Sequence, residues 1–177
     1  NLVFPAHLLI TNDPPVVTVD NFQGLWKDDG SGLKLIARSG SPAPGAGGAL
    51  WDILPMIPAI TDSGDVTFFA SLRVGSPTVT GTSDTALWTQ IGGGGLKLLL
   101  REGDSIAPAI SGANVSYFGS GAFATATLSP TTGTAAYPVN LTGSTTDSAI
   151  IRSNINGSTI THTLVARENS PAPGTTE

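Results

Sequence analysis

Few side chains in this sequence are suited to acid–base, metal or nucleophilic chemistry. Its 177 residues include 13 Asp and Glu, 8 Lys and Arg, two His and no Cys. The absence of Cys excludes thiol catalysis, disulfides and Cys-based zinc sites. His7 and His162 lie far apart in the chain at positions that do not correspond in the repeat described below, so we do not expect a shared zinc site. The charged residues that recur at regular spacing are therefore the main candidates for a site.

An aspartate and an arginine recur in each third of the chain, with a turn-rich segment between them. If each segment folds as a β-hairpin, the two residues lie opposite each other and can form an ion pair. The third pair is one residue out of step, a slip that a β-bulge would absorb. A ligand site in every repeat is the alternative interpretation, but the pair recurs without a matching variety of neighbours, which favours a structural role. The three pairs are Asp20 with Arg38, Asp84 with Arg101, and Asp147 with Arg167.

An acidic turn at residues 62–65 contains Asp62 and Asp65, whose carboxylates could contribute to a calcium site. A calcium loop needs oxygen ligands at about five or six positions. The corresponding turn at 131–133 has no carboxylate, and a hairpin turn that uses Gly for its positive φ explains both copies. We therefore expect no cofactor, with calcium near Asp62 and Asp65 as the alternative.

The sequence offers no convergent catalytic set. It has no Gly-x-Ser-x-Gly nucleophile motif. Glu102 and Glu168 stand at the same position of different repeats, which makes them part of the scaffold and not an acid–base couple. We therefore predict that the protein is not an enzyme.

The three tryptophans divide into two kinds. Trp26 and Trp88 occupy the same repeat position, where the third repeat has Ile151, so this position predicts packing. Trp51 follows the glycine-rich segment 45–48. Because tryptophans on exposed loops are well suited to stack against sugars, Trp51 is the tryptophan that we expect to face a ligand.

Three ordered landmarks recur three times and define a repeat that covers the whole chain. They are an aromatic residue four positions before a Leu, an acidic residue before an apolar strand, and an apolar strand that ends in Arg. The segment 41–45, Ser-Pro-Ala-Pro-Gly, also returns at 170–174. We place the repeats at residues 1–61, 62–129 and 130–177, with the last one incomplete. The aromatic landmarks are Phe4, Phe68 and Tyr137.

Composition and turn signals predict an all-β fold. The chain contains 22 Gly and 13 Pro, which suits short strands joined by turns and argues against long helices. We expect about four antiparallel strands in each repeat, an arrangement that favours propeller-like blades. A β-sandwich is the alternative architecture. Hairpin turns are expected near residues 28–30, 92–95 and 156–157, and the fourth strand over 50–60 and 115–128.

At these landmarks the chain resembles the tandem-repeat surface proteins of bacteria whose unit is summarised as N-x-x-G-x-x-x-F. The Arg-Glu-Gly-Asp stretch of that family is matched at residues 101–104, whereas the leading Asn is replaced by Thr61 and Pro130. The resemblance implies an exported bacterial protein, secreted or at the cell surface, and it implies no known activity and no catalytic residues. The Gly and aromatic positions of the unit are matched by Gly64 with Phe68 and by Gly133 with Tyr137.

Charge and hydropathy exclude several classes of partner. The net charge of −5 with 8 basic residues disfavours nucleic-acid binding. The apolar runs are far too short to span a membrane as a helix. Three Asn residues have the form of N-glycosylation sequons, a number that says little in a chain so rich in Ser and Thr. They are Asn114, Asn140 and Asn156.

We therefore expect a non-enzymatic extracellular structural or assembly module. The repeats open on the strand at Phe4, and their last landmark ends at Gly174, before the fourth strand of the last repeat. Open strand edges invite association, so we expect a homo-oligomer or a filament, or pairing with the remainder of a longer chain. A carbohydrate-binding, lectin-like β-propeller with glycan partners is the alternative function.

Overall fold

Antiparallel β-sheets make up the computed structural model of the chain. The structure describes residues 1–10, 16–54, 58–118, 126–129, 133–142, 147–171 and 174. These residues form β-strands, turns and loops and include no helix, so the prediction of an all-β antiparallel fold is confirmed. Accordingly, no helix in the described part of the chain is long and apolar enough to cross a membrane.

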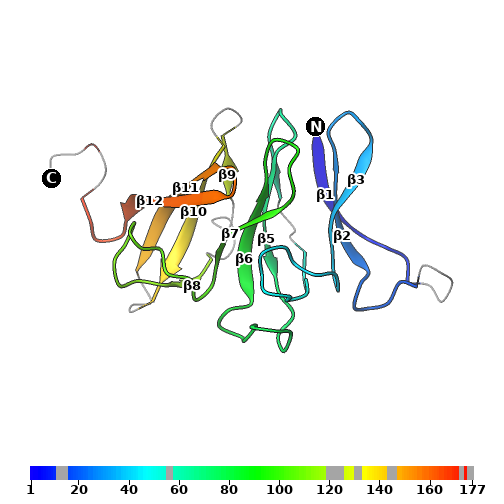
Figure 1. Cartoon of the computed structure of the whole chain (residues 1–177), viewed down its shortest axis with the longest axis horizontal. Helices are drawn as coiled ribbons and strands as arrows, with labels where there is room; N and C mark the ends of the chain where they lie inside the picture. Colours follow the sequence, from blue (N-terminus) through cyan, green and yellow to red (C-terminus); the bar gives the residue numbers. More distant parts are fainter. Residues whose placement is uncertain are drawn as a thin grey trace.

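Three sheets follow one another along the chain and lie side by side (Figure 1). Sheet 1 has the order β1-β2-β3, sheet 2 has the order β4-β5-β6-β7, and in sheet 3 the order is β12-β11-β10 with β8 and β9 both paired to β10. Sheet 1 contains β1 (Leu2–His7), β2 (Gln23–Asp28) and β3 (Leu33–Arg38). Sheet 2 contains β4 (Ala59–Ile60), β5 (Val66–Ser71), β6 (Thr85–Gln90) and β7 (Lys97–Arg101). Sheet 3 contains β8 (Val115–Tyr117), β9 (Thr127–Leu128), β10 (Thr134–Leu141), β11 (Ser148–Asn156) and β12 (Thr159–Arg167).

The repeat of the sequence returns as equivalent positions in the three sheets. Trp26, Trp88 and Ile151 each stand opposite the aromatic landmark of their own repeat and opposite a Leu of the next strand. The rows read Phe4, Trp26 and Leu35 in sheet 1, Phe68, Trp88 and Leu98 in sheet 2, and Tyr137, Ile151 and Leu164 in sheet 3.

A β-bulge interrupts each of the three hairpins at the same place. The register shifts directly before Trp26, Trp88 and Ile151, which leaves one residue of the following strand without a partner. The spacing predicts a bulge in the third hairpin alone, because counting outward from the turns leaves the first two in step. The unpaired residues are Ile36 in β3, Leu99 in β7 and Val165 in β12.

The turn of the third hairpin also lies one residue later than the Asn-Gly pair suggests. Asn156 still belongs to β11 and pairs with Thr159, so the turn consists of Gly157 and Ser158. Gly157 is the first turn residue and has a φ of 59°, as a type II′ turn requires. The Asn-Gly pair therefore predicted a hairpin correctly. The centre of the turn lies one residue later because Gly157, which adopts a positive φ, is the first turn residue.

The fourth strand is divided into two short pieces in sheets 2 and 3. In sheet 2, Trp51 forms an isolated bridge with Leu72, and β4 pairs with the other end of β5. In sheet 3, β8 and β9 pair with the two ends of β10 in the same way. Residues 55–57 and 119–125 of the expected strands lie outside the described residues.

Each sheet has two faces, which we call the front and the back. The front carries Leu25, Leu87 and Ile150 in sheets 1, 2 and 3, and the back carries the neighbouring positions Trp26, Trp88 and Ile151. One hydrophobic cluster joins Leu25 and Ala37 with Phe68 and Trp88, so the front of sheet 1 packs on the back of sheet 2. The other joins Leu87 with Tyr137 and Ile151, so the front of sheet 2 packs on the back of sheet 3. The same face-to-face contact is therefore used twice.

Candidate functional site

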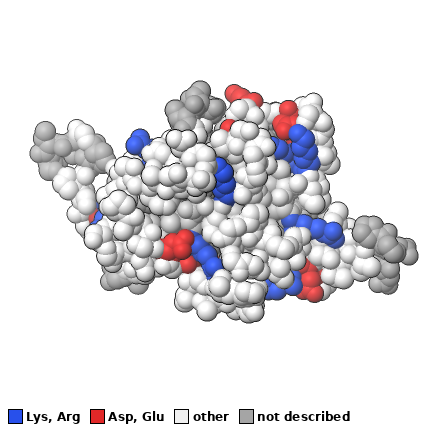
Figure 2. Space-filling view, in the orientation of Figure 1, with Lys and Arg blue, Asp and Glu red and all other residues white. Residues whose placement is uncertain are grey.

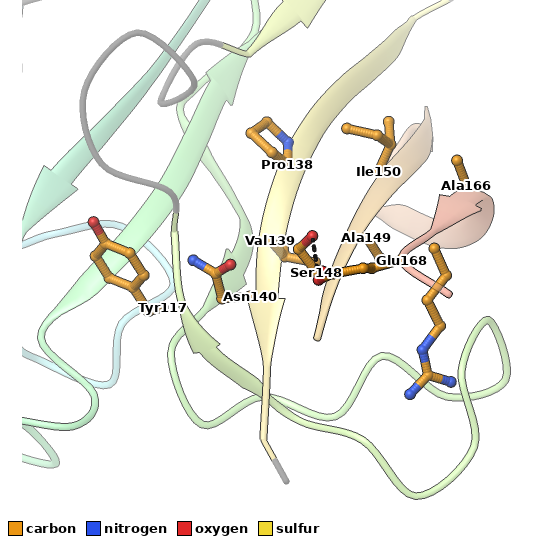
Figure 3. Close-up of a pocket in the computed structure, with 10 residues that line it drawn as sticks. Tyr117, Pro138, Val139, Asn140, Ser148, Ala149, Ile150, Ala166 and Glu168 are labelled. Carbon is orange, nitrogen blue, oxygen red and sulfur yellow. Dashed lines mark hydrogen bonds between the residues drawn. The ribbon is translucent and has the colours of Figure 1, made fainter. Parts of the chain in front are cut away.

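The front of sheet 3 carries a groove of about 550 Å³ (Figure 3). Pro138, Ile150 and Ala166 are register partners on β10, β11 and β12 and form its apolar floor. Pro138 has no N–H to donate, and it lies between the segments of β10 that pair with β8 and β9. Polar side chains and one aromatic ring surround this floor. They are Tyr117, Asn140, Ser148, Arg167 and Glu168.

An ion pair lies at the rim of the groove. The Arg167 guanidinium donates to both carboxylate oxygens of Asp147, with Nε–Oδ1 at 2.9 Å and Nη2–Oδ2 at 2.6 Å. These hydrogen bonds from Arg167 lower the pKa of Asp147. Beside the pair, the Ser148 hydroxyl donates to Glu168 at 3.3 Å, as the dashed line in Figure 3 marks. The third pair that the sequence suggested is thus brought together, at a bidentate geometry.

The structure does not bring together the other two aspartate–arginine pairs. Arg38 stands opposite Gly24, and Arg101 stands opposite Ala86. The register of the first hairpin thus displaces Arg38 from Asp20. In the second hairpin Arg101 is offset from Asp84 by two residues, the same offset at which Arg167 binds Asp147 in the third, so the register does not separate this pair. Asp84 lies against Glu102 instead.

These two arginines hold the backbone that enters the middle strand. Arg38 Nε donates to the carbonyl of Asn21 at 2.7 Å, and Arg101 Nε donates to the carbonyl of Ser83 at 2.6 Å. Arg101 also donates to the carbonyl of Thr78 at 2.7 Å. The side chain of Asp20 instead lies 3.6 Å from Arg73. The recurring arginine therefore has one role in all three sheets, which is to fix the segment before the middle strand.

Asp84 lies against a buried glutamate, a contact that no signal in the sequence suggests. Glu102 is 6% exposed and accepts a hydrogen bond from the Thr85 backbone N–H at 3.1 Å. Burial raises the pKa of Glu102 to about 7, and the neighbouring Asp84 contributes to this rise by hydrogen bonding and charge. The Glu102 carboxyl group therefore keeps its proton to a higher pH than an exposed glutamate does.

A serine, a histidine and a tyrosine form a second polar cluster. Ser153 Oγ lies 2.8 Å from His162 Nδ1 and 2.6 Å from the Tyr137 hydroxyl. Burial lowers the pKa of His162, partly offset by Asp104, and burial raises the pKa of Tyr137 to about 12. Ser153 is fully buried in the contact between sheets 2 and 3. A hydroxyl without solvent access cannot reach a substrate, so this cluster satisfies buried polar groups.

The carboxylate of Asp65 is engaged by hydrogen bonds. Its two oxygens accept from Gly92 N–H at 2.7 Å and from the Ser63 hydroxyl at 2.9 Å. The neighbouring Asp62 uses its backbone carbonyl to accept from the Asn1 side chain at 2.6 Å. No group of three or more His, Cys, Asp or Glu side chains in the described residues could hold a metal ion.

Trp51 does not face a ligand, and this prediction was wrong. The side chain is 1% exposed, and its ring lies 4.2 Å from that of Trp88 in the core between sheets 1 and 2. Its counterpart in the next repeat is Val115, which is equally buried at the same position beside Leu141. A glycine-rich segment precedes Trp51, but the pairing of Trp51 with Leu72 turns its ring inward.

Charged groups are sparse and mixed on the surface. On the face shown in Figure 2, acidic and basic side chains lie in small groups, several of them with both signs adjacent. One group joins Lys27, Asp29 and Lys34, and Lys27 also donates to the carbonyl of Gly64 in sheet 2. These contacts connect neighbouring strands and sheets.

Comparison with known proteins identifies the family. No curated protein and no solved structure matches the chain. The family model described as Family of unknown function (DUF7453) matches residues 3–168, which is nearly the whole sequence. The chain therefore belongs to the DUF7453 family.

Proposed function

We propose that this chain is a non-enzymatic structural module of an extracellular bacterial assembly. The observation that carries the proposal is the use of its recurring charged residues. Arg38, Arg101 and Arg167 each bind the segment that precedes a middle strand of their own sheet, and none of them converges with another on a common pocket. A chain whose repeated polar side chains serve its own scaffold is suited to bearing load or presenting surfaces.

The array of sheets supports a propeller-like interpretation of the repeats. Sheet 2 buries both of its faces, one against each neighbour, whereas each sheet of a two-layer β-sandwich buries one. A series of antiparallel sheets that pack face to face through equivalent residues is typical of blades. We therefore propose propeller-like blades over the β-sandwich alternative.

Self-association through strand edges is part of the proposal. β5 and β10 have strands paired on both sides, whereas in the described residues β1 pairs with β2 alone. An unpaired edge presents N–H and C=O groups to a partner strand. The edge of β1 is therefore suited to receive a strand of a neighbouring molecule.

A lectin-like function is the second candidate, and the groove on sheet 3 is the observation that favours it. Tyr117 is an exposed aromatic residue, and Asn140 and Glu168 lie nearby with groups that can hydrogen-bond sugar hydroxyls. Figure 3 shows Tyr117 and Asn140 on the same side of the groove. A groove of this size could accept one or two sugar rings, within the range usual for ligand sites.

Light scattering and electron microscopy of the purified chain, together with a glycan array, test the two functions. The structural module predicts concentration-dependent assembly and no glycan binding. A monomeric chain that binds a glycan, with binding lost in the Tyr117→Ala variant and retained in the control variant Val74→Ala, would favour the lectin instead. Val74 is a suitable control because it is exposed in a loop outside the groove.

A further inference from the structure

The two outermost faces of the array are apolar and have no partner sheet in the described residues. The back of sheet 1, which we call the N-terminal face, carries the row Phe4, Trp26 and Leu35. The front of sheet 3, which we call the C-terminal face, carries the row Pro138, Ile150 and Ala166. Leu35 is 52% exposed, whereas Leu98 at the corresponding inner position is partly buried and packs against the core. Ile150 is 39% exposed, whereas Leu25 at the corresponding inner position is fully buried.

The composition of these two faces matches the existing contact between sheets 1 and 2. There, the front row of sheet 1 packs on the back row of sheet 2. The C-terminal face repeats the Pro, branched aliphatic and Ala pattern of the front row, and the N-terminal face repeats the Phe, Trp and Leu pattern of the back row. The front row is Pro5, Leu25 and Ala37, of which Leu25 and Ala37 are buried in the contact and Pro5 is exposed. The back row is Phe68, Trp88 and Leu98.

The inner contact also includes a loop that receives the tryptophan. The Trp88 indole N–H donates to the carbonyl of Pro44 at 2.9 Å, and Gly45 approaches Leu98 so closely that a Cβ there would lie 2.9 Å from the Leu98 side chain. This loop has the sequence Ser-Pro-Ala-Pro-Gly at 41–45, and the sequence recurs at 170–174, after the strand that borders the C-terminal face. The sequence thus repeats the tryptophan, at Trp26, and the segment that contacts it, of which residues 172–173 lie outside the described residues.

We propose that the C-terminal face of one copy binds the N-terminal face of a second copy, head to tail. Trp26 then takes the position that Trp88 occupies between sheets 1 and 2. Such a contact continues an interface that the chain already uses. At the groove, Arg167 and Asp147 already neutralise each other, and Glu168 accepts a hydrogen bond from Ser148. The proposal rests on the proposed structural function, but it assigns the association to sheet faces and not to the edge of β1.

A head-to-tail contact uses two different surfaces, and this property makes a specific test available. Ile150→Lys places a charge on the C-terminal face, and Leu35→Lys places one on the N-terminal face. Both side chains are exposed, so the variants should fold, and circular dichroism checks that they do. Val74→Lys is the matched control, since it charges an exposed apolar residue in a loop outside both faces.

Sedimentation velocity over a range of concentrations provides the measurement. The wild type and Val74→Lys should associate, and each face variant alone should weaken association by about tenfold or more. An equimolar mixture of Ile150→Lys and Leu35→Lys should form a one-to-one dimer, because each variant keeps the face that the other has lost.

Two outcomes would overturn the head-to-tail contact. One is that both face variants assemble as fully as the wild type does. That result would leave the structural function in place, with association through strand edges. The other is a pair of folded variants that form no dimer when mixed. A wild-type chain that stays monomeric and binds glycans would instead refute the structural function itself.

Discussion

Trp26 and Trp88 share one position of the repeat but have different surroundings. Trp88 is fully buried between sheets 1 and 2, and its indole is hydrogen-bonded to Pro44. Trp26 is half-buried on the N-terminal face, where it stacks on Phe4 with ring centroids 6.5 Å apart. The six-membered ring of its indole lies over Gly24, at which a Cβ would stand 2.1 Å from that ring. One residue type at one repeat position therefore contributes unequally to stability.

Alanine substitution should reveal this difference. Trp88→Ala should lower the free energy of unfolding by about 3–5 kcal/mol, because it leaves a cavity in a closed core. Trp26→Ala, the matched control, should cost less than about 2 kcal/mol, because its face has no described sheet packed on it. Urea denaturation at protein concentrations too low for association makes the comparison. Equal losses would show that the two indoles are equally buried.

Glu102 should make stability depend on pH. Its pKa is about 7 in the folded chain against 4.5 for an unperturbed glutamate, so between these values the folded chain holds a proton that the unfolded chain has released. The free energy of unfolding should therefore fall as pH rises from about 4.5 to about 7, by on the order of 1–2 kcal/mol. The Glu102→Gln variant should lose this dependence.

Denaturation curves collected across that pH range measure the effect. Glu168→Gln is the control, because Glu168 occupies the same repeat position but is exposed. A Glu102→Gln variant with the same pH slope as the wild type would contradict a raised pKa at this carboxyl group.

At the scale of the elements, the bulges set which residues meet. Each one lies directly before the position of Trp26, Trp88 or Ile151 and shifts the following strand by one residue. Because side chains alternate between the faces of a sheet, such a shift determines on which face of the sheet the arginine beyond the bulge lies. In sheet 3 it places Arg167 opposite Ala149, within reach of Asp147.

Deleting Val165, the unpaired residue of β12, tests this role. The deletion should lower the free energy of unfolding by more than about 2 kcal/mol, because either Arg167 loses Asp147 or the strand beyond the bulge changes face. Val165→Ala is the control and should cost less than about 1 kcal/mol, since this side chain is 44% exposed. Chemical denaturation compares them, and a deletion as mild as the substitution would show that the bulge is dispensable.

At the scale of the whole molecule, we expect each sheet to be stabilised chiefly by the sheet next to it. The hydrophobic cluster between sheets 1 and 2 and the cluster between sheets 2 and 3 both include residues of β6, Trp88 in one and Leu87 in the other. Sheets 1 and 3 contribute to different clusters. In repeat proteins each unit is stabilised chiefly by its neighbours.

Hydrogen exchange of the Ile151→Ala variant should follow this arrangement. The substitution removes buried side-chain atoms from the contact between sheets 2 and 3, at a cost of about 2–5 kcal/mol. Backbone exchange should accelerate most in β10 and β11, less in β6, and least in β2. The Leu25→Ala variant, which alters the other contact, serves as the reciprocal control. Uniform acceleration over all three sheets by both variants would show that the chain unfolds as a single unit.

The sequence by itself determined the all-β class, the threefold repetition and the equivalence of Trp26, Trp88 and Ile151. These follow from turn residues and recurring landmarks, which are local signals that the chain carries in each repeat. The same signals located the hairpin at Gly157 to within one residue. They also suggested Asp147 and Arg167 as partners, but the same reasoning paired Asp20 with Arg38 and Asp84 with Arg101, which the structure does not bring together.

Only the tertiary structure decided the partners of Arg38 and Arg101, the contact between Asp84 and Glu102, and the burial of Trp51. The partner of Arg38 depends on the register, and no turn signal specifies the position of the bulge that sets it. Arg101 has the same offset from Asp84 that Arg167 has from Asp147, so its partners depend instead on Glu102 lying beside Asp84 and on the carbonyls of Thr78 and Ser83. Trp51 is buried because sheets 1 and 2 pack around it, and Trp26 stays half-exposed because no described sheet covers its face. Burial depends on which sheet lies opposite, and that neighbour is distant in the sequence.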